Sequence, residues 1–151
     1  RSAGVFQEYL GLPGAARKAF QDGWFRTGDE AIVENGYYRI LGRSSIDIIK
    51  TGGHKVSALE IERVLRTHPL IEECAVVGIA DEEWGERVCA AVILGSDASL
   101  SADDLRHWGK ERLAPYKVPT EFVMATEFPR NAMGKVIKPT IRGWFQSQLP
   151  S

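Results

Sequence analysis

Cysteine is scarce in this sequence, because 151 residues include only two, Cys74 and Cys89. Each lies inside an apolar run, so no disulfide framework is predicted. A reducing compartment, either the cytoplasm or the mitochondrial matrix, suits this usage. Histidine is almost as rare, and the three histidines have no spacing with cysteine or aspartate that is typical of metal ligands. We therefore predict no metal site.

An excess of charge of one sign is also absent, because 19 basic side chains stand against 20 acidic ones. This balance argues against nucleic acid and anionic membranes as general partners. The longest apolar runs, residues 75–80 and 88–94, are far shorter than the roughly 20 residues of a membrane span. The sequence has neither an initiator methionine nor a visible signal peptide, and we expect it to be a piece of a longer protein.

The apolar residues that are present make up 44% of the chain, which is enough for one or two domains with a hydrophobic core. Asn35-Gly36 between β-forming residues predicts a hairpin. A helix is predicted between Ser57, which forms the pattern of a capping box with Glu60, and Pro69, which stops it. The other predicted elements are helices at 15–21, 101–113 and 139–148 and strands at 74–79, 88–94 and 121–125. Alternation of helices with short strands predicts an α+β fold.

Two charged residues flank the predicted hairpin. Asp29 follows Gly28 and precedes the first strand, where a carboxylate can accept two hydrogen bonds from a vicinal diol such as ribose. Arg43 lies just past the second strand, and a guanidinium suits phosphate or ribose oxygens. Taken alone, Asp29 also fits a turn cap and Arg43 a surface salt bridge, so both interpretations stay open.

Residues 42–55 are polar and contain several glycines, which predicts a domain junction. Within them, Gly52 and Gly53 let the backbone approach a ligand closely, and Lys50 and Lys55 favour an anion. The spacing of a Walker phosphate loop is absent. The same residues also fit a glycine-rich turn with solvated lysines.

Lys135 follows a glycine on a predicted loop, residues 129–135. A flexible loop can carry an ammonium group into a site and withdraw it. A compact positive charge on a long stem is suited to neutralising a pentavalent phosphorus transition state. An exposed lysine with no catalytic task fits the same pattern.

As an ordered set, these clusters resemble the adenylate-forming superfamily of acyl-CoA synthetases, luciferases and nonribosomal adenylation domains. The resemblance extends over residues 5–138. Residues 43–62, 113–117 and 129–135 are most similar to malonyl-CoA synthetases.

The resemblance implies a large amino-terminal domain followed by a small, mobile carboxyl-terminal domain. Residues 1–42 would be the tail of the large domain, 43–47 the hinge, and 48–151 the mobile domain. The mobile domain would be an α+β fold of short sheets packed with about three helices, preceded by a hairpin from the end of the large domain. The phosphate loop and acyl pocket would lie in the missing amino-terminal domain, so this chain alone would be inactive.

The resemblance also implies an acid–thiol ligase that acts in two steps. A small carboxylic acid, malonate or a related acid, would react with ATP, bound with Mg²⁺, to form acyl-AMP. Coenzyme A would then take the acyl group as a thioester. Asp29 would bind the ribose hydroxyls, Arg43 would contact ribose or phosphate, and Lys135 would bridge the carboxylate and the α-phosphate.

After the first step the small domain of such enzymes rotates and presents another face. The loop of Gly52, Gly53 and His54 would then line the tunnel for the pantetheine arm. Lys50, the second candidate catalytic residue, and Lys55 would lie near the adenylate or coenzyme A.

The sequence departs from the superfamily pattern at two places. Between Arg43 and the two glycines it has one residue more than many relatives, so the hinge residue is either Ser45 or Asp47. Trp84 stands where some relatives carry an arginine that helps to bind coenzyme A. Two other functions stay open: an adenylating enzyme that transfers acyl groups to a carrier protein, and a stand-alone nucleotide-binding module.

Overall fold

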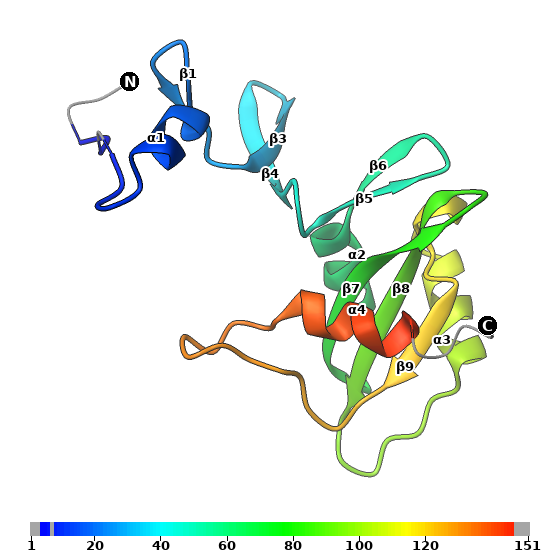
Figure 1. Cartoon of the computed structure of the whole chain (residues 1–151). Coiled ribbons are helices and arrows are strands. Elements are labelled where there is room, and N and C mark those ends of the chain that lie inside the picture. Colours follow the sequence, from blue (N-terminus) through cyan, green and yellow to red (C-terminus); the bar gives the residue numbers. More distant parts are fainter. Residues whose placement is uncertain (1–3, 7, 147–151) are drawn as a thin grey trace.

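The computed structural model describes residues 4–6 and 8–146. Figure 1 shows small elements at the amino-terminal end and a larger unit of sheet and helices after β4. The first part contains helix α1 (Pro13–Ala19), a hairpin of β1 (Phe20–Gln21) and β2 (Trp24–Phe25), and a hairpin of β3 (Asp29–Glu34) and β4 (Tyr37–Arg43). Helix α1 lies two residues earlier than predicted, because residues 20 and 21 pair with β2 instead.

The predicted hairpin around Asn35-Gly36 is confirmed. Asn35 and Gly36 have φ angles of 52° and 81°, the left-handed conformation that both central residues of a type I′ turn require. Asp29 and Arg43, which were predicted to flank the two strands, are instead their last paired residues. The turn sets the register up to Ala31 and Ile40, and a register shift between Glu30 and Ala31 then places Asp29 opposite Arg43.

The larger part confirms the predicted α+β architecture with a hairpin in front of it. Its elements are β5 (Ile48–Thr51), β6 (His54–Ser57), α2 (Ala58–Leu65), β7 (Ile71–Asp81), β8 (Gly85–Leu94), α3 (Ala102–Lys110), the 3-10 helix η1 (Pro115–Lys117), β9 (Glu121–Met124) and α4 (Lys138–Gln146). The strands form one sheet in the order β6-β5-β8-β7, and β9 pairs with β8 in parallel. All other pairs in this sheet are antiparallel.

The hairpin of β5 and β6 is a difference from the prediction, which placed a domain junction with a glycine-rich turn at residues 42–55 and no strands. Each strand has four residues, and together they contain three apolar ones, Ile48, Ile49 and Val56. All three are buried. Four residues are too few to show a two-residue repeat clearly, so the burial depends on the rest of the sheet.

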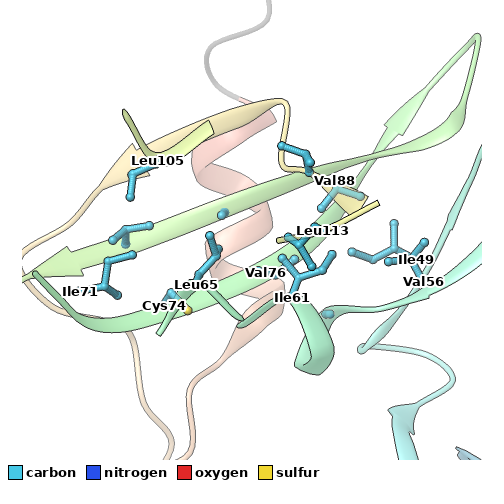
Figure 2. Close-up of a cluster of buried hydrophobic side chains, with 14 residues drawn as sticks. Ile49, Val56, Ile61, Leu65, Ile71, Cys74, Val76, Val88, Leu105 and Leu113 are labelled. Atoms are coloured by element: carbon cyan, nitrogen blue, oxygen red, sulfur yellow. The ribbon is translucent and has the colours of Figure 1, made fainter. Parts of the chain in front are cut away.

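The central sheet is covered on both faces. On one face, α2 and α3 pack on alternate residues of β7 and β8; Figure 2 shows Ile61, Leu65 and Leu105 in this cluster. On the other face, Ile141 and Phe145 of α4 pack on the remaining residues of the same strands. Strands buried on both faces are apolar without interruption, which explains why β7 and β8 were predictable.

The predicted starts of α2 and α3 are confirmed, with a difference in the cap of α2. Ser101 and Asp104 form a complete capping box at α3. At α2, Ser57 Oγ accepts a hydrogen bond from the Glu60 N–H at 3.3 Å, but the Glu60 carboxylate accepts from Lys117 Nζ at 2.8 Å. Helix α3 ends at Lys110, three residues before the predicted end, and the predicted end of α4 lies outside the described residues. In the described part of the chain, no helix has the length and apolarity needed to cross a membrane.

Candidate functional site

Asp29 and Arg43 form an ion pair at the open end of the β3–β4 hairpin. Arg43 Nε lies 3.1 Å from Asp29 Oδ1. The Arg43 side chain is 62% exposed and that of Asp29 33%, so both remain accessible to a ligand. The structure therefore brings together the two residues that were predicted to bind a nucleotide. An accessible pair of this kind contributes little to stability.

Residues 43–47 connect this hairpin to the larger part in a single closed turn. The Asp47 N–H donates to the Arg43 carbonyl at 2.8 Å, and the Arg43 N–H donates to Asp47 Oδ2 at 3.0 Å. Gly42 has a φ of 129°, and a Cβ there would lie 2.5 Å from Asp47 Cβ. Ser45 is exposed, whereas Asp47 is buried. The two candidate hinge residues thus have opposite environments.

The Gly52-Gly53 turn joins β5 to β6, and its two glycines have different environments. A Cβ on Gly52 would lie 2.9 Å from the Trp84 ring, whereas a Cβ on Gly53 would meet nothing within 4 Å. The Gly52 N–H donates to the Trp84 carbonyl at 3.0 Å. The close approach predicted for these glycines is therefore to Trp84 at Gly52, and only Gly53 faces open space.

The other residues of this hairpin contact three separate elements. His54 stacks on Tyr116, with 4.1 Å between the ring centroids. Lys55 Nζ lies 3.1 Å from Glu30 Oε1 on β3. The Lys50 N–H donates to Glu86 Oε2 at 2.6 Å, and the Lys50 side chain is exposed.

A pocket of about 500 Å³ opens beside this turn, between the β7–β8 turn and η1. Half-exposed Trp84 and Tyr116 line it together with Arg87 and Thr51. Trp84 is 49% exposed. The Gly52 contact holds one side of the ring, which leaves the other side to the pocket.

Lys135 lies on a hydrogen-bonded loop. Asn131 Oδ1 accepts from the N–H groups of Met133 and Lys135, each at 3.0 Å, and the Asn131 N–H donates to the Lys135 carbonyl at 2.9 Å. Arg130 donates to the Gly134 carbonyl at 2.8 Å and forms a two-oxygen ion pair with Glu73 on β7. The flexible loop predicted here is instead tied to itself and to the sheet.

The Lys135 ammonium is exposed and has no ion-pair partner among the residues that the structure describes. Figure 1 places its loop, drawn in orange, on the side of the larger part opposite to the β5–β6 hairpin. The predicted site residues therefore form two groups. One group lies around the 43–47 turn and the β5–β6 hairpin and consists of Asp29, Arg43, Lys50 and residues 52–55. Lys135 lies apart from them.

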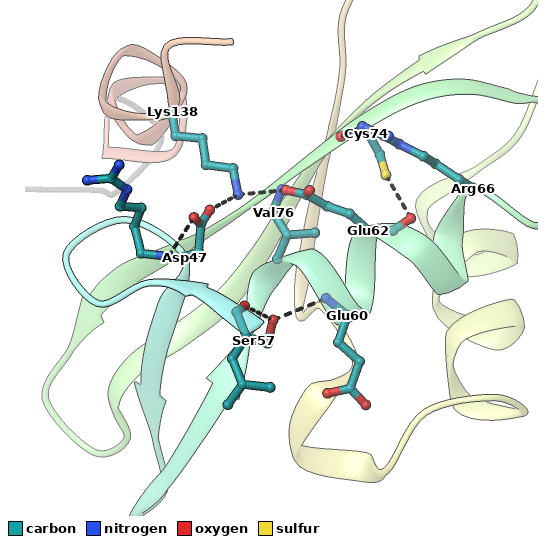
Figure 3. A network of polar contacts seen from close by, with 10 residues as sticks. Asp47, Ser57, Glu60, Glu62, Arg66, Cys74, Val76 and Lys138 are labelled. Atoms are coloured by element: carbon teal, nitrogen blue, oxygen red, sulfur yellow. Dashed lines mark hydrogen bonds and ion pairs between the residues drawn. The ribbon is translucent and has the colours of Figure 1, made fainter. Parts of the chain in front are cut away.

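Figure 3 shows a buried ionic cluster next to the 43–47 turn that the sequence did not predict. Lys138 Nζ lies 2.6 Å from Asp47 Oδ1 and 2.8 Å from Glu62 Oε1. The same Glu62 oxygen accepts from the Val76 N–H at 2.9 Å. The three charged residues are each at most 9% exposed. Lys138 resembles any other lysine in the sequence, and no sequence signal indicates its burial.

Comparison with known proteins identifies relatives of this arrangement. Residues 60–135 match the family described as the AMP-binding enzyme C-terminal domain. The chain is 54% identical over 139 residues to the mitochondrial malonate–CoA ligase of Mus musculus, a match that covers 91% of this chain and 24% of that protein. The chain thus spans about a quarter of the length of the curated relatives it matches.

Two solved structures of one protein, MatB from Rhodopseudomonas palustris, resemble the chain to different degrees. The ATP-bound form has a TM-score of 0.85 at 34% identity, covering 94% of this chain and 28% of that one. The apo form has a TM-score of 0.70 at 35% identity with the same coverage. At nearly equal identity and coverage, the overall structure of this chain is more similar to the ATP-bound form.

Proposed function

This chain belongs to the family of AMP-binding enzyme C-terminal domains, and we propose that it is the mobile part of an ATP-dependent acyl-CoA synthetase. In the first step, a carboxylate oxygen of the acid attacks the α-phosphate of ATP, and pyrophosphate leaves. In the second step, the thiol of coenzyme A attacks the acyl carbon of acyl-AMP, and AMP leaves. We propose malonate as the acid, because the mouse relative is a malonate–CoA ligase.

The observation that carries this proposal is the exposed Lys135 ammonium, which has no ion-pair partner among the described residues, on a fixed loop. Charge develops on the phosphate oxygens as the carboxylate attacks, and a pre-positioned ammonium stabilises it. Because Asn131 and Arg130 hold the loop, the ammonium reaches and leaves the reaction centre through movement of the domain as a whole. ATP enters as its Mg²⁺ complex, since this ion is commonly held by substrate phosphates.

The exposed pair of Asp29 and Arg43 would contact the nucleotide in this first step. The Asp29 carboxylate can exchange the Arg43 guanidinium, 3.1 Å away, for the two ribose hydroxyls. The freed guanidinium can then bind ribose or phosphate oxygens. An accessible ion pair is easily separated, so this exchange costs little.

The opposite face would serve the second step. Open space at Gly53 leaves room for the pantetheine arm beside the turn. The adjoining pocket, lined by Trp84 and Tyr116, offers aromatic surface that replaces the arginine expected at position 84. Lys50 and Lys55 would lie near the adenylate or coenzyme A in this pose.

We propose the same domain boundaries as above, with residues 1–42 as the tail of a large domain. Supporting this, the β3–β4 hairpin exposes four large apolar side chains by more than 60% each: Val33, Tyr37, Tyr38 and Ile40. In the complete polypeptide, the large domain would pack against these side chains and cover them. The name of the mouse relative favours the mitochondrial matrix over the cytoplasm.

The test separates the two steps in the complete enzyme that contains this chain. Lys135→Ala should slow formation of malonyl-AMP by about 100-fold or more, because one pre-positioned charge at a transition state contributes that much. It should leave thioester formation from supplied malonyl-AMP unchanged. Trp84→Ala is the matched variant for the other face, and should raise the KM for coenzyme A by about tenfold through loss of aromatic contact.

Pyrophosphate exchange measures the first step, and coenzyme A consumption with supplied adenylate measures the second. If Lys135→Ala slows both steps equally, the assignment of the two faces is wrong. If the unsubstituted enzyme catalyses no ATP–pyrophosphate exchange with any small carboxylic acid, the proposed reaction is wrong.

A further inference from the structure

The buried ionic cluster connects the hinge turn to the loop of the candidate catalytic lysine. Figure 3 shows Lys138 extending from the start of α4 toward Asp47 and Glu62. Lys138 lies three residues after Lys135, where the loop enters the helix. Asp47 closes the turn that follows Arg43. One ammonium group thus joins the end of the loop to the end of the hinge.

The two oxygens of the Asp47 carboxylate have separate partners. Oδ1 accepts from Lys138 Nζ at 2.6 Å, and Oδ2 accepts from the Arg43 N–H at 3.0 Å. Arg43 is the residue proposed to contact the nucleotide. The carboxylate therefore links the nucleotide side of the hinge to the base of the Lys135 loop, and both oxygens are needed for this link.

Glu62 holds the same ammonium in a different way. Its Oε1 atom forms an ion pair with Lys138 Nζ at 2.8 Å and accepts a hydrogen bond from the Val76 N–H at 2.9 Å. Through Glu62, Lys138 is therefore connected to α2 and β7, within the larger part. Glu62 therefore anchors Lys138 to the core, whereas Asp47 connects it to the hinge.

We propose that Asp47 is a positioning residue for adenylation, which sets the Lys135 loop relative to the hinge through Lys138. This rests on the proposed function. Asp47 is then fixed within the moving unit, and rotation takes place before it, at exposed Ser44 and Ser45. An ammonium that must meet a phosphorus centre tolerates little displacement, so a loosened connection reduces the rate more than the affinity.

Two isosteric substitutions separate this role from simple loss of charge. Asp47→Asn leaves one acceptor oxygen for two donors, so either Lys138 or the Arg43 N–H faces an amide NH₂. Glu62→Gln removes one charge from the same cluster but can keep an Oε1 atom that accepts from the Val76 N–H and faces the Lys138 ammonium. Both variants change the charge of the cluster by the same amount and almost conserve volume.

In the complete enzyme, Asp47→Asn should lower kcat of adenylation by about tenfold to 100-fold with little change in KM for ATP. Thioester formation from supplied acyl-AMP should be kept, and Glu62→Gln should affect neither step. Equal effects of the two variants on adenylation, or equal loss of both steps in Asp47→Asn, would overturn the proposal.

Hydrogen exchange of this chain gives a readout that does not depend on the reaction. In Asp47→Asn, the amide of Arg43 and those at the start of α4 should exchange faster, while those of β7 and β8 stay protected. Faster exchange throughout the sheet would show a general loss of stability and contradict the proposal. If these exchange results hold but the enzyme forms no acyl-AMP, the proposed function fails and the physical link remains.

Discussion

Each of the two cysteine thiols lies in the core on a different face of the sheet. Cys74 belongs to the cluster beneath α2 and α3, and Cys89 to the cluster beneath α4. Burial raises the pKa of both thiols from an ordinary 9.0 to about 12, with smaller contributions from the carboxylates of Glu62 and Glu121. At neutral pH both thiols are therefore protonated and slow to react.

We expect the stability of the chain to fall as pH rises from about 9 to about 12. In this range the unfolded chain loses its thiol protons while the folded chain keeps them, so ionisation favours unfolding. Below pH 9 both states are protonated and the contribution of the thiols is fully present. Urea unfolding across this range measures the effect.

The double variant Cys74→Ala, Cys89→Ala is the control. Its stability should depend less steeply on alkaline pH, since the other titrating groups are unchanged. An identical pH dependence in the two proteins would show that the thiols do not contribute.

Two lysines, Lys135 and Lys138, show which functional residues can be predicted from the sequence and which cannot. Lys135 was identified because it follows a glycine within a recognisable cluster, and the structure leaves it exposed. Lys138 is 8% exposed and pairs with two carboxylates, but its partners lie 91 and 76 positions away. Side-chain burial of this kind depends on packing between distant segments, so the local sequence contains no sign of it.

The α2 helix illustrates how an element's end can also hold two parts together. Ser57 Oγ accepts from the Glu60 N–H and donates to the Leu41 carbonyl at 2.5 Å. Ser57 is 4% exposed, so water cannot easily replace these bonds. The cap therefore fixes both the start of α2 and its contact with β4.

Ser57→Ala should reduce the free energy of unfolding by about 1–2 kcal/mol, because it removes a cap and leaves two polar groups unpaired. Ser101→Ala, which removes the exposed cap of α3, is the matched control and should have a smaller effect. Urea unfolding monitored by circular dichroism compares them. A smaller loss in Ser57→Ala than in Ser101→Ala would contradict this explanation.

The predictability of the strands follows from their surroundings. The runs in β7 and β8 are apolar on both faces and were predicted, as was the Asn35-Gly36 hairpin, whose turn residues determine its geometry. The β5–β6 hairpin was missed because its burial comes from β8 and the neighbouring helices rather than from its own pattern. Of the capping box predicted at Ser57, only the hydrogen bond from the Glu60 N–H to Ser57 Oγ forms, because the Glu60 carboxylate accepts from Lys117 of η1 instead.

At the scale of the whole molecule, the two parts of the chain differ in how many hydrophobic side chains they bury. Every buried hydrophobic side chain described in the structure lies between Ile48 and Phe145. Among the described residues of the amino-terminal part, Phe6, Tyr9, Phe20 and Phe25 form a small aromatic cluster, and no hydrophobic side chain is buried. The larger part therefore has a hydrophobic core of its own, as an independent folding unit requires, and the amino-terminal part does not.

A chain shortened to residues 43–151 should unfold in one cooperative transition with nearly the same urea midpoint as the full 151 residues. It keeps the sheet, its three helices and the Asp47 cluster, and loses mainly the contacts of Leu41 and Glu30. Circular dichroism measures the transition. A non-cooperative transition would show that residues 1–42 are part of the same folding unit.

The sequence by itself determined the class of fold, the ordered clusters that indicate an adenylate-forming enzyme, and Lys135 as the residue to test. These depend on local patterns: turn residues, apolar runs and short motifs. Only the tertiary structure decided that Asp29 pairs with Arg43, that Gly52 packs on Trp84, and that Lys138 is buried between Asp47 and Glu62. Such contacts join segments far apart in the chain, and they form only when the sheet has fixed where each segment lies.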